Sequence, residues 1–149
     1  MINETVKLKG DLVITVLDKD GAVKERREEK NLIVSAGLTF ICSRMANATA
    51  GVMSHMAVGS GTATPAAANT DLGTILGARE PLDSTTASSN TVTYVSSFEA
   101  GEGTGAVTEA GLFNAASSGT MLCRTVFPVV NKGANDTMAI TWTITLSAS

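Results

Sequence analysis

The chain has 149 residues, of which 44% are hydrophobic and 17% are charged, and its net charge is −3. This length fits one domain, which can bury a core without a disulfide framework or a structural metal. A slightly acidic chain lacks the basic excess that neutralises phosphates, so we expect no direct nucleic-acid binding. The charged share is below the usual level of about 25%, and Thr, Ser, Ala and Gly take its place. Such a surface favours a protein packed against neighbours over a free enzyme.

Two features bear on the compartment in which the chain is made. It opens with MINETVKLKG, a polar stretch that lacks the apolar segment of a secretory signal. Its apolar runs fall short of the roughly 20 residues that cross a bilayer. We therefore expect a soluble protein of a reducing cytoplasm with no membrane contact. The two cysteines, Cys42 and Cys123, are too few for a disulfide scaffold, and we expect them to be buried as small hydrophobic residues.

The first third of the chain predicts a hairpin followed by a helix. Apolar and polar residues alternate over residues 6–16, which predicts a half-buried strand with Gly10 as a bulge or bend. The DKDG segment at 18–21 is typical of a tight turn. A second strand, expected over residues 23–34, completes an N-terminal hairpin within residues 1–34. Apolar side chains then recur at helical spacing and predict one short helix over residues 37–46.

The remaining strands are expected within residues 54–147, joined by Gly-, Ser-, Thr- and Asn-rich turns. They cover residues 54–59, 79–82, 91–99, 106–113, 120–128 and 136–146. The connections include a loop at 59–69, a helical turn at 70–76, a solvated loop at 83–90 and a glycine-rich turn at 101–105. Trp142 alternates with threonines in the last strand, so we expect it to be buried. This pattern predicts an all-β fold, a β-sandwich or jelly-roll-like single domain over residues 1–149 with one short helix.

Residues with catalytic or metal-binding chemistry are sparse. The single histidine, His55, is expected to be structural, because a strand would point its neighbour Ser54 to the opposite face. Asp18 and Asp20 begin like a calcium loop but lack the glycine and the next oxygen ligand, so they predict a plain turn. The glycines at 101–105 lead into a strand, whereas a phosphate loop leads into a helix. We therefore predict no catalytic, cofactor-binding or metal-binding residues, and no enzyme.

Three glutamates allow carboxylate pairs of the kind that glycosidases use. The pairs are Glu99 with Glu102 and Glu102 with Glu109. Only 4% of the residues are aromatic, and no aromatic sugar platform lies nearby in the sequence, which argues against a hydrolytic or carbohydrate-binding domain. We expect Glu109 to have a different partner. It lies inside one apolar strand and Arg124 inside the next, so the two are expected to form a cross-strand ion pair.

Segments of the second half resemble virion proteins of tailed bacteriophages. They are MAVGSGTATPAAANTDLG (56–73), VTEAGLFNAASSGTMLCRTVFPVVNKG (107–133) and DTMAITWTITLS (136–147). The N-terminal MINETVKLKGDLVITVLD and NLIVSAGL are similar to phage proteins encoded near capsid genes. The resemblance covers most of the chain, and related modules occur both in capsid decoration (cement) proteins and at the bases of tail fibres.

The resemblance implies a decoration protein that binds the phage head shell in many copies and stabilises it by mass action. Its partners would be the major capsid protein and further copies of itself, as a dimer or trimer. It would be made in the bacterial host cytoplasm and reside on the capsid surface of the virion. The alternative is a tail or tail-fibre attachment component, which the absence of any shaft repeat disfavours. We expect residues 1–9 to contribute to binding as an arm.

Overall fold

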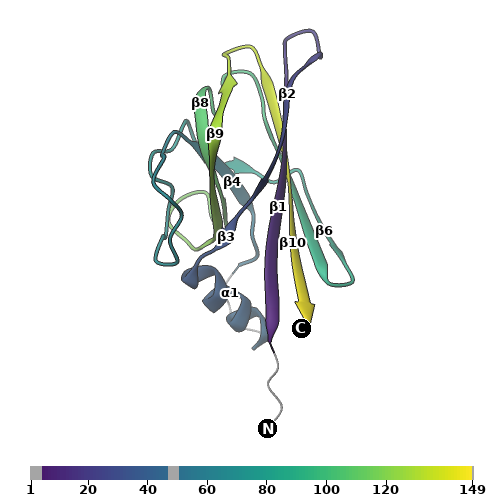
Figure 1. Ribbon diagram of the computed structural model, residues 1–149, viewed down its shortest axis with the longest axis vertical. Helices are drawn as coiled ribbons and strands as arrows, with labels where there is room; N and C mark the ends of the chain where they lie inside the picture. Colours follow the sequence, from purple (N-terminus) through teal and green to yellow (C-terminus); the bar gives the residue numbers. More distant parts are fainter. Residues whose placement is uncertain (1–4, 47–50, 149) are drawn as a thin grey trace.

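The computed structural model describes residues 5–46 and 51–148, and within them the chain forms two antiparallel sheets and one helix (Figure 1). Sheet A has the strand order β2 (Val23–Lys30), β1 (Val6–Leu17), β10 (Thr137–Ala148), β7 (Thr91–Phe98), β6 (Ser84–Ser88). Sheet B has the order β3 (Leu32–Ile33), β9 (Met121–Lys132), β8 (Gly105–Phe113), β4 (His55–Gly59), β5 (Glu80–Pro81). The predicted all-β, sandwich-like fold with one short helix is confirmed.

The core lies between the two sheets and is built by the period-two alternation of sheet A. Leu12 of β1 is the register partner of Trp142 of β10, which in turn pairs with Tyr94 of β7, and all three are buried. Sheet B covers them with residues that include Met56 and Leu112, both fully buried. The predicted burial of Trp142 is confirmed. Because alternate residues face opposite sides of a strand, the threonines of β10 lie on the outer face of sheet A.

The chain passes from sheet A to sheet B at Asn31, and this divides the strand that we expected over residues 23–34. Its first part is β2, which pairs with β1, and its last part is β3, which pairs with β9. Gly10 is not a β-bulge, since the register of β1 with β10 runs through Gly10 without a shift. The irregularity of β1 falls instead at Val16 and Leu17, opposite β2.

Two connections differ from their predictions. Residues 84–88 of the expected solvated loop form β6, although all five side chains are exposed, because they pair with the whole first half of β7. Polar composition suggested a loop, but exposed edge strands are polar too. The helical turn expected at 70–76 is wrong: this segment has no helix, and Ile75 instead makes an isolated bridge to Gly59.

The helix α1 (Ser35–Met45) starts two residues earlier than expected and lies at the end of the sandwich where β1 begins and β10 ends (Figure 1). Phe40 and Gly37 form its buried side. Gly37 is needed there because a Cβ would come 2.1 Å from the carbonyl oxygen of Leu122 in β9. Cys42 lies on the exposed side, so its predicted burial is wrong, whereas Cys123 is buried as expected.

Candidate functional site

The most elaborate polar site in the described chain surrounds the carboxylate of Glu109, which is fully buried in β8. Three backbone N–H groups donate to it: Gly61 at 2.6 Å, Gly73 at 2.8 Å and Thr74 at 2.8 Å. Arg124 of β9 donates from Nε at 3.1 Å, which confirms the predicted cross-strand ion pair. We call these five residues the Glu109 cluster. The ion pair was predicted from the sequence, but the three amide donors were not, since backbone groups leave no signature in the sequence.

The hydrogen bonds of the Glu109 cluster set the charge state of its carboxylate. Burial by itself would raise the pKa of Glu109. The N–H donors of Thr74, Gly73 and Gly61 and the guanidinium of Arg124 outweigh burial, so the pKa of Glu109 lies below its ordinary value. The side chain is therefore an ionised carboxylate held in the protein interior, an arrangement that requires all its partners to stay in place.

Glycines make the Glu109 cluster sterically possible. A Cβ on Gly61 would come 2.3 Å from Oε2 of Glu109, and a Cβ on Gly59 would come 2.6 Å from the same atom. Arg124 continues the network by donating from Nη1 to Oδ1 of Asn69 at 3.1 Å. The loop between β4 and β5 is thus fixed at several points along its length by one buried ion pair. The chemistry is that of a structural clamp, because every oxygen of Glu109 is already engaged.

A second anchor holds the far end of the same loop. The guanidinium of Arg79 lies 3.7 Å from the ring centroid of Phe113, a cation–π contact. Its Nη1 donates to the carbonyl oxygens of Ala115 and Ser118, at 2.9 and 2.7 Å. The loop is therefore bound to the β8–β9 turn as well as to the strands beneath it.

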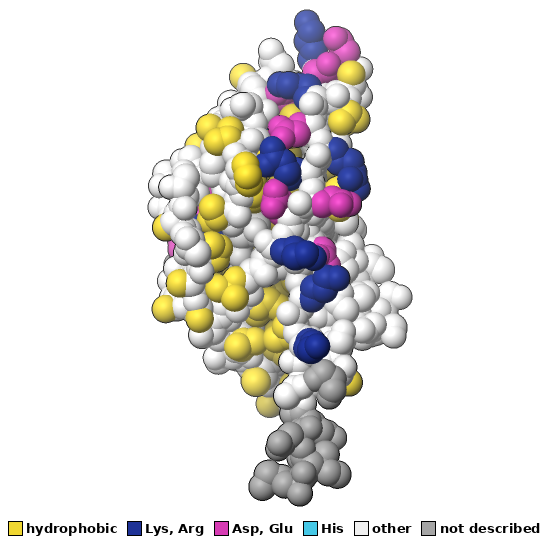
Figure 2. Space-filling model, viewed as in Figure 1, with side chains coloured by type: hydrophobic (Ala, Val, Ile, Leu, Met, Phe, Trp, Pro, Cys, Tyr) yellow, Lys and Arg dark blue, Asp and Glu magenta, His cyan; other side chains and the backbone are white. Residues whose placement is uncertain are grey.

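An open apolar groove of about 350 Å³ lies between α1 and the end of sheet A. We call it the α1 groove, and its lining includes Phe40, Ile41, Met45, Tyr94, Ile144 and Leu146. Met45 is 83% exposed at its edge. Burial raises the pKa of Tyr94 to about 12, so its hydroxyl stays neutral at physiological pH. Hydrophobic side chains gather at this end of the molecule in Figure 2, and the groove is an apolar surface suited to another protein.

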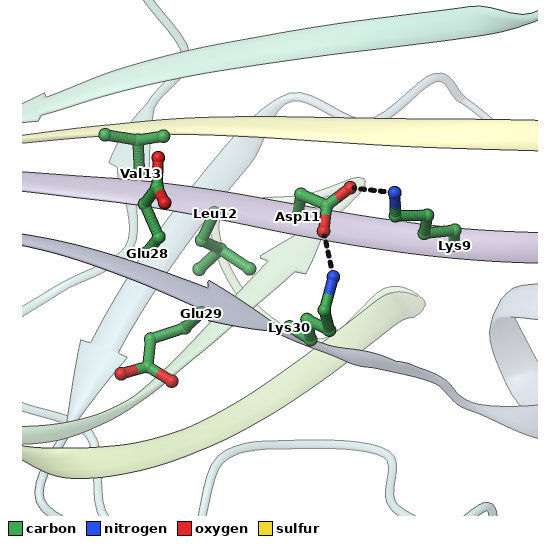
Figure 3. A pocket seen from close by; sticks show the side chains of 7 residues that line it. All are labelled: Lys9, Asp11, Leu12, Val13, Glu28, Glu29 and Lys30. Atoms are coloured by element: carbon green, nitrogen blue, oxygen red, sulfur yellow. Dashed lines mark hydrogen bonds and ion pairs between the residues drawn. The ribbon is translucent and has the colours of Figure 1, made fainter.

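Charged side chains concentrate on a different surface, along β1 and β2. Figure 2 shows Lys and Arg interspersed with Asp and Glu over the upper part of this surface, and mainly Lys and Arg toward its lower end. In a polar hollow there, Asp11 lies between Lys9 and Lys30, with oxygen-to-Nζ distances of 3.4 and 3.0 Å (Figure 3). Burial opposes ionisation of Asp11, yet the two lysines hold its pKa below the ordinary value. Opposite charges on neighbouring side chains partly neutralise each other at this surface.

The side chains of His55 and Ser54 are closer than strand alternation predicts. Ser54 Oγ lies 2.8 Å from His55 Nδ1, because Ser54 precedes β4 and is not bound by strand alternation. Burial and the charge of Glu102 raise the pKa of Glu80 of β5, and the neighbouring His55 opposes this shift. The expectation that strand alternation would separate Ser54 from His55 is therefore wrong.

The other residues considered for chemistry serve in turns. Asp18 accepts bonds from the N–H groups of Asp20 and Ala22, as the predicted plain turn requires. Glu102 accepts from the N–H of Glu99 at 2.8 Å, within the glycine-rich turn. In the described ranges, no group of His, Cys, Asp or Glu side chains could hold a metal ion. Among the same residues, no helix has the length and apolar character needed to cross a membrane.

Comparisons with known proteins bring no relative to this chain. No protein-family model matches the sequence, no curated protein matches it, and no solved structure matches the fold.

Proposed function

We propose that this chain is a non-enzymatic capsid decoration protein of a tailed bacteriophage, which binds the head shell in many copies and stabilises it. The proposal rests on the resemblance of separate sequence segments to phage virion proteins, and one observation supports it: these segments converge on one carboxylate. Gly61 and Gly73 come from the segment 56–73, while Glu109 and Arg124 come from the segment 107–133. The residues that carry the resemblance thus form one physical unit, in which glycines let a loop close on a buried ion pair.

The surface also supports a protein that works by contact. The outer face of β10, β7 and β6 carries Thr, Ser, Ala and Val without a charge, and the α1 groove is apolar. We assign the α1 groove to the contact with the shell, because burying exposed apolar area is the main source of binding free energy. Binding only the expanded shell would stabilise that state by mass action. Repetition over the shell would make modest single-site affinity effective.

The test is to add the purified protein to expanded heads that lack it. Saturable binding in hundreds of copies, with a rise in the melting temperature of the shell, is the expected result. Failure to bind, or a location at the tail in a copy number matching fibres, would contradict the proposal and favour the tail-attachment alternative. Any turnover activity lost in His55→Ala protein would argue for an enzyme.

Two matched variants examine the assigned contact. Met45→Glu places a charge at the edge of the α1 groove, and Val23→Glu places one on β2; both side chains are mostly exposed, at 83% and 63%. Each variant should therefore fold normally. We expect Met45→Glu to lower shell occupancy at least tenfold at a fixed protein concentration, and Val23→Glu to leave it unchanged. Equal occupancy for the two variants would remove the α1 groove from the proposal.

A further inference from the structure

The two sheets have four edge strands, and three of them carry features that block pairing with another chain. β2 is a run of charged residues, KERREEK, after its first valine. β3 has two residues, and β5 has two residues of which one is Pro81, which has no N–H to donate. Charge, shortness and proline are the means by which proteins protect sheet edges.

The fourth edge, β6, has none of these features. Its five residues, Ser84–Ser88 with the sequence STTAS, are uncharged and all exposed, and no proline interrupts them. Its inner edge pairs with β7 over its full length. Alternate residues of an antiparallel strand direct their N–H and C=O groups away from the existing partner. β6 therefore presents a row of backbone donors and acceptors to solvent.

We infer that β6 is a self-association edge, at which two copies of this chain pair β6 to β6 in antiparallel fashion about a two-fold axis. Full overlap of the five residues places Thr86 on the axis opposite Thr86 of the second copy. Ser84 then lies opposite Ser88, and Thr85 opposite Ala87. The two five-stranded A sheets become one continuous sheet. A closed two-fold contact uses the same patch on both copies, so pairing at β6 stops at two copies.

A second copy is the occupant that the surrounding surface favours. Thr86 is in register with Thr93 of β7, which is in register with Thr143 of β10. The hydroxyls of Thr93 and Thr143 lie 3.4 Å apart. Two-fold pairing continues this row of threonines across the axis, where threonine pairs are favourable. β6, β7 and β10 carry no charged side chain, so no like charges repel each other when two copies pair.

Disulfide trapping tests the register of the pair. In a Cys42→Ser background, Thr86→Cys places two thiols opposite each other on the axis, within the separation that a disulfide spans. Ser88→Cys is the matched control, because its thiol faces position 84 of the second copy and not itself. Mixing Ser84→Cys protein with Ser88→Cys protein should restore cross-linking. We expect Thr86→Cys to cross-link at least tenfold faster than Ser88→Cys alone. Equal rates for these two variants would overturn the inference.

A charge swap tests the same contact without cysteines. Thr86→Lys and Thr86→Glu each put like charges opposite each other, and each should weaken dimerisation in sedimentation equilibrium by about tenfold or more. An equimolar mixture of the two should associate again, because Lys then faces Glu. A folding defect would not be repaired by mixing. A wild-type chain that stays monomeric at all accessible concentrations, or variants that dimerise as wild type does, would refute the pairing. Neither result depends on whether the protein binds phage heads.

Discussion

The side chain of Asn31 lies against Gly10, at the point where the chain leaves sheet A for sheet B. A Cβ on residue 10 would fall 1.4 Å from Oδ1 of Asn31, and the N–H of Asn31 donates to the carbonyl oxygen of Gly10 at 3.1 Å. Both polar atoms of the Asn31 amide are buried without a hydrogen-bond partner among the described residues. Gly10 therefore leaves room for the Asn31 side chain at the point where the chain crosses between the sheets.

Gly10→Ala should destabilise the protein, because the new methyl group must displace the Asn31 side chain from a packed site. We expect a loss of about 1–3 kcal/mol in the free energy of unfolding, the range for overpacking a core, measured by urea denaturation. Gly51→Ala is the control, since a Cβ there meets nothing within 4 Å, and it should change stability by less than about 0.5 kcal/mol. Equal stability of the two variants would contradict this account of Gly10.

Breaking the Glu109 cluster should cost more than any surface pair. Glu109→Gln leaves Arg124 buried without a counter-charge, so we expect a loss of about 3–5 kcal/mol in unfolding free energy. Lys30→Ala, which breaks the exposed contact with Asp11, should cost at most about 1 kcal/mol. The double variant Glu109→Gln, Arg124→Met should lose clearly less than the sum of its single variants. Additive losses would show that the two side chains are not coupled.

The lowered pKa of Glu109 predicts how the stability of the protein depends on pH. The folded pKa of Glu109 lies below the ordinary value of 4.5, so its ionised form stabilises the fold above that pH. This contribution should be lost as pH falls below about 4.5 and through the folded pKa. Urea denaturation from about pH 7 to 3 should show a steeper acid loss for wild type than for Glu109→Gln, which cannot titrate. Parallel curves would rule out Glu109 as a main acid-sensitive group.

The sequence predicted the parts of the fold that depend on alternation. β1 and β10 alternate with a period of two, and their faces are assigned correctly from Gly10 to Val16 and from Met138 to Ile144, where every second residue is buried. β6 was missed because no buried face imposes a pattern on STTAS; its strand form comes from pairing with β7. The division of β2 from β3 was missed for a similar reason. The crossing at Asn31 depends on the partner strands β1 and β9, which are distant from each other in the sequence.

The candidate functional site, like the fold, was predicted only in part from the sequence. Glu109 and Arg124 stand out in the sequence because charges are unusual within apolar strands, and their pairing follows from adjacent strands. The α1 groove was not predicted, because its lining comes from α1, β7, β9 and β10, and only the tertiary fold brings these together. The expected arm is only partly described: residues 1–4 lie outside the described residues, and from Val6 onward the segment is strand β1.

Trp142 offers a test of whether core volume or hydrogen bonding limits stability. It is fully buried, and its Nε1 has no hydrogen-bond partner among the described residues. Trp142→Ala should cost about 3–5 kcal/mol, the range for deleting a large core aromatic side chain. Trp142→Phe keeps an aromatic ring and removes the unpaired N–H, so the gain from losing a buried unsatisfied donor offsets part of the lost volume. We expect it to cost less than about 1.5 kcal/mol in thermal and urea unfolding. A cost for Trp142→Phe close to that of Trp142→Ala would mean that the indole nitrogen is bonded in solution.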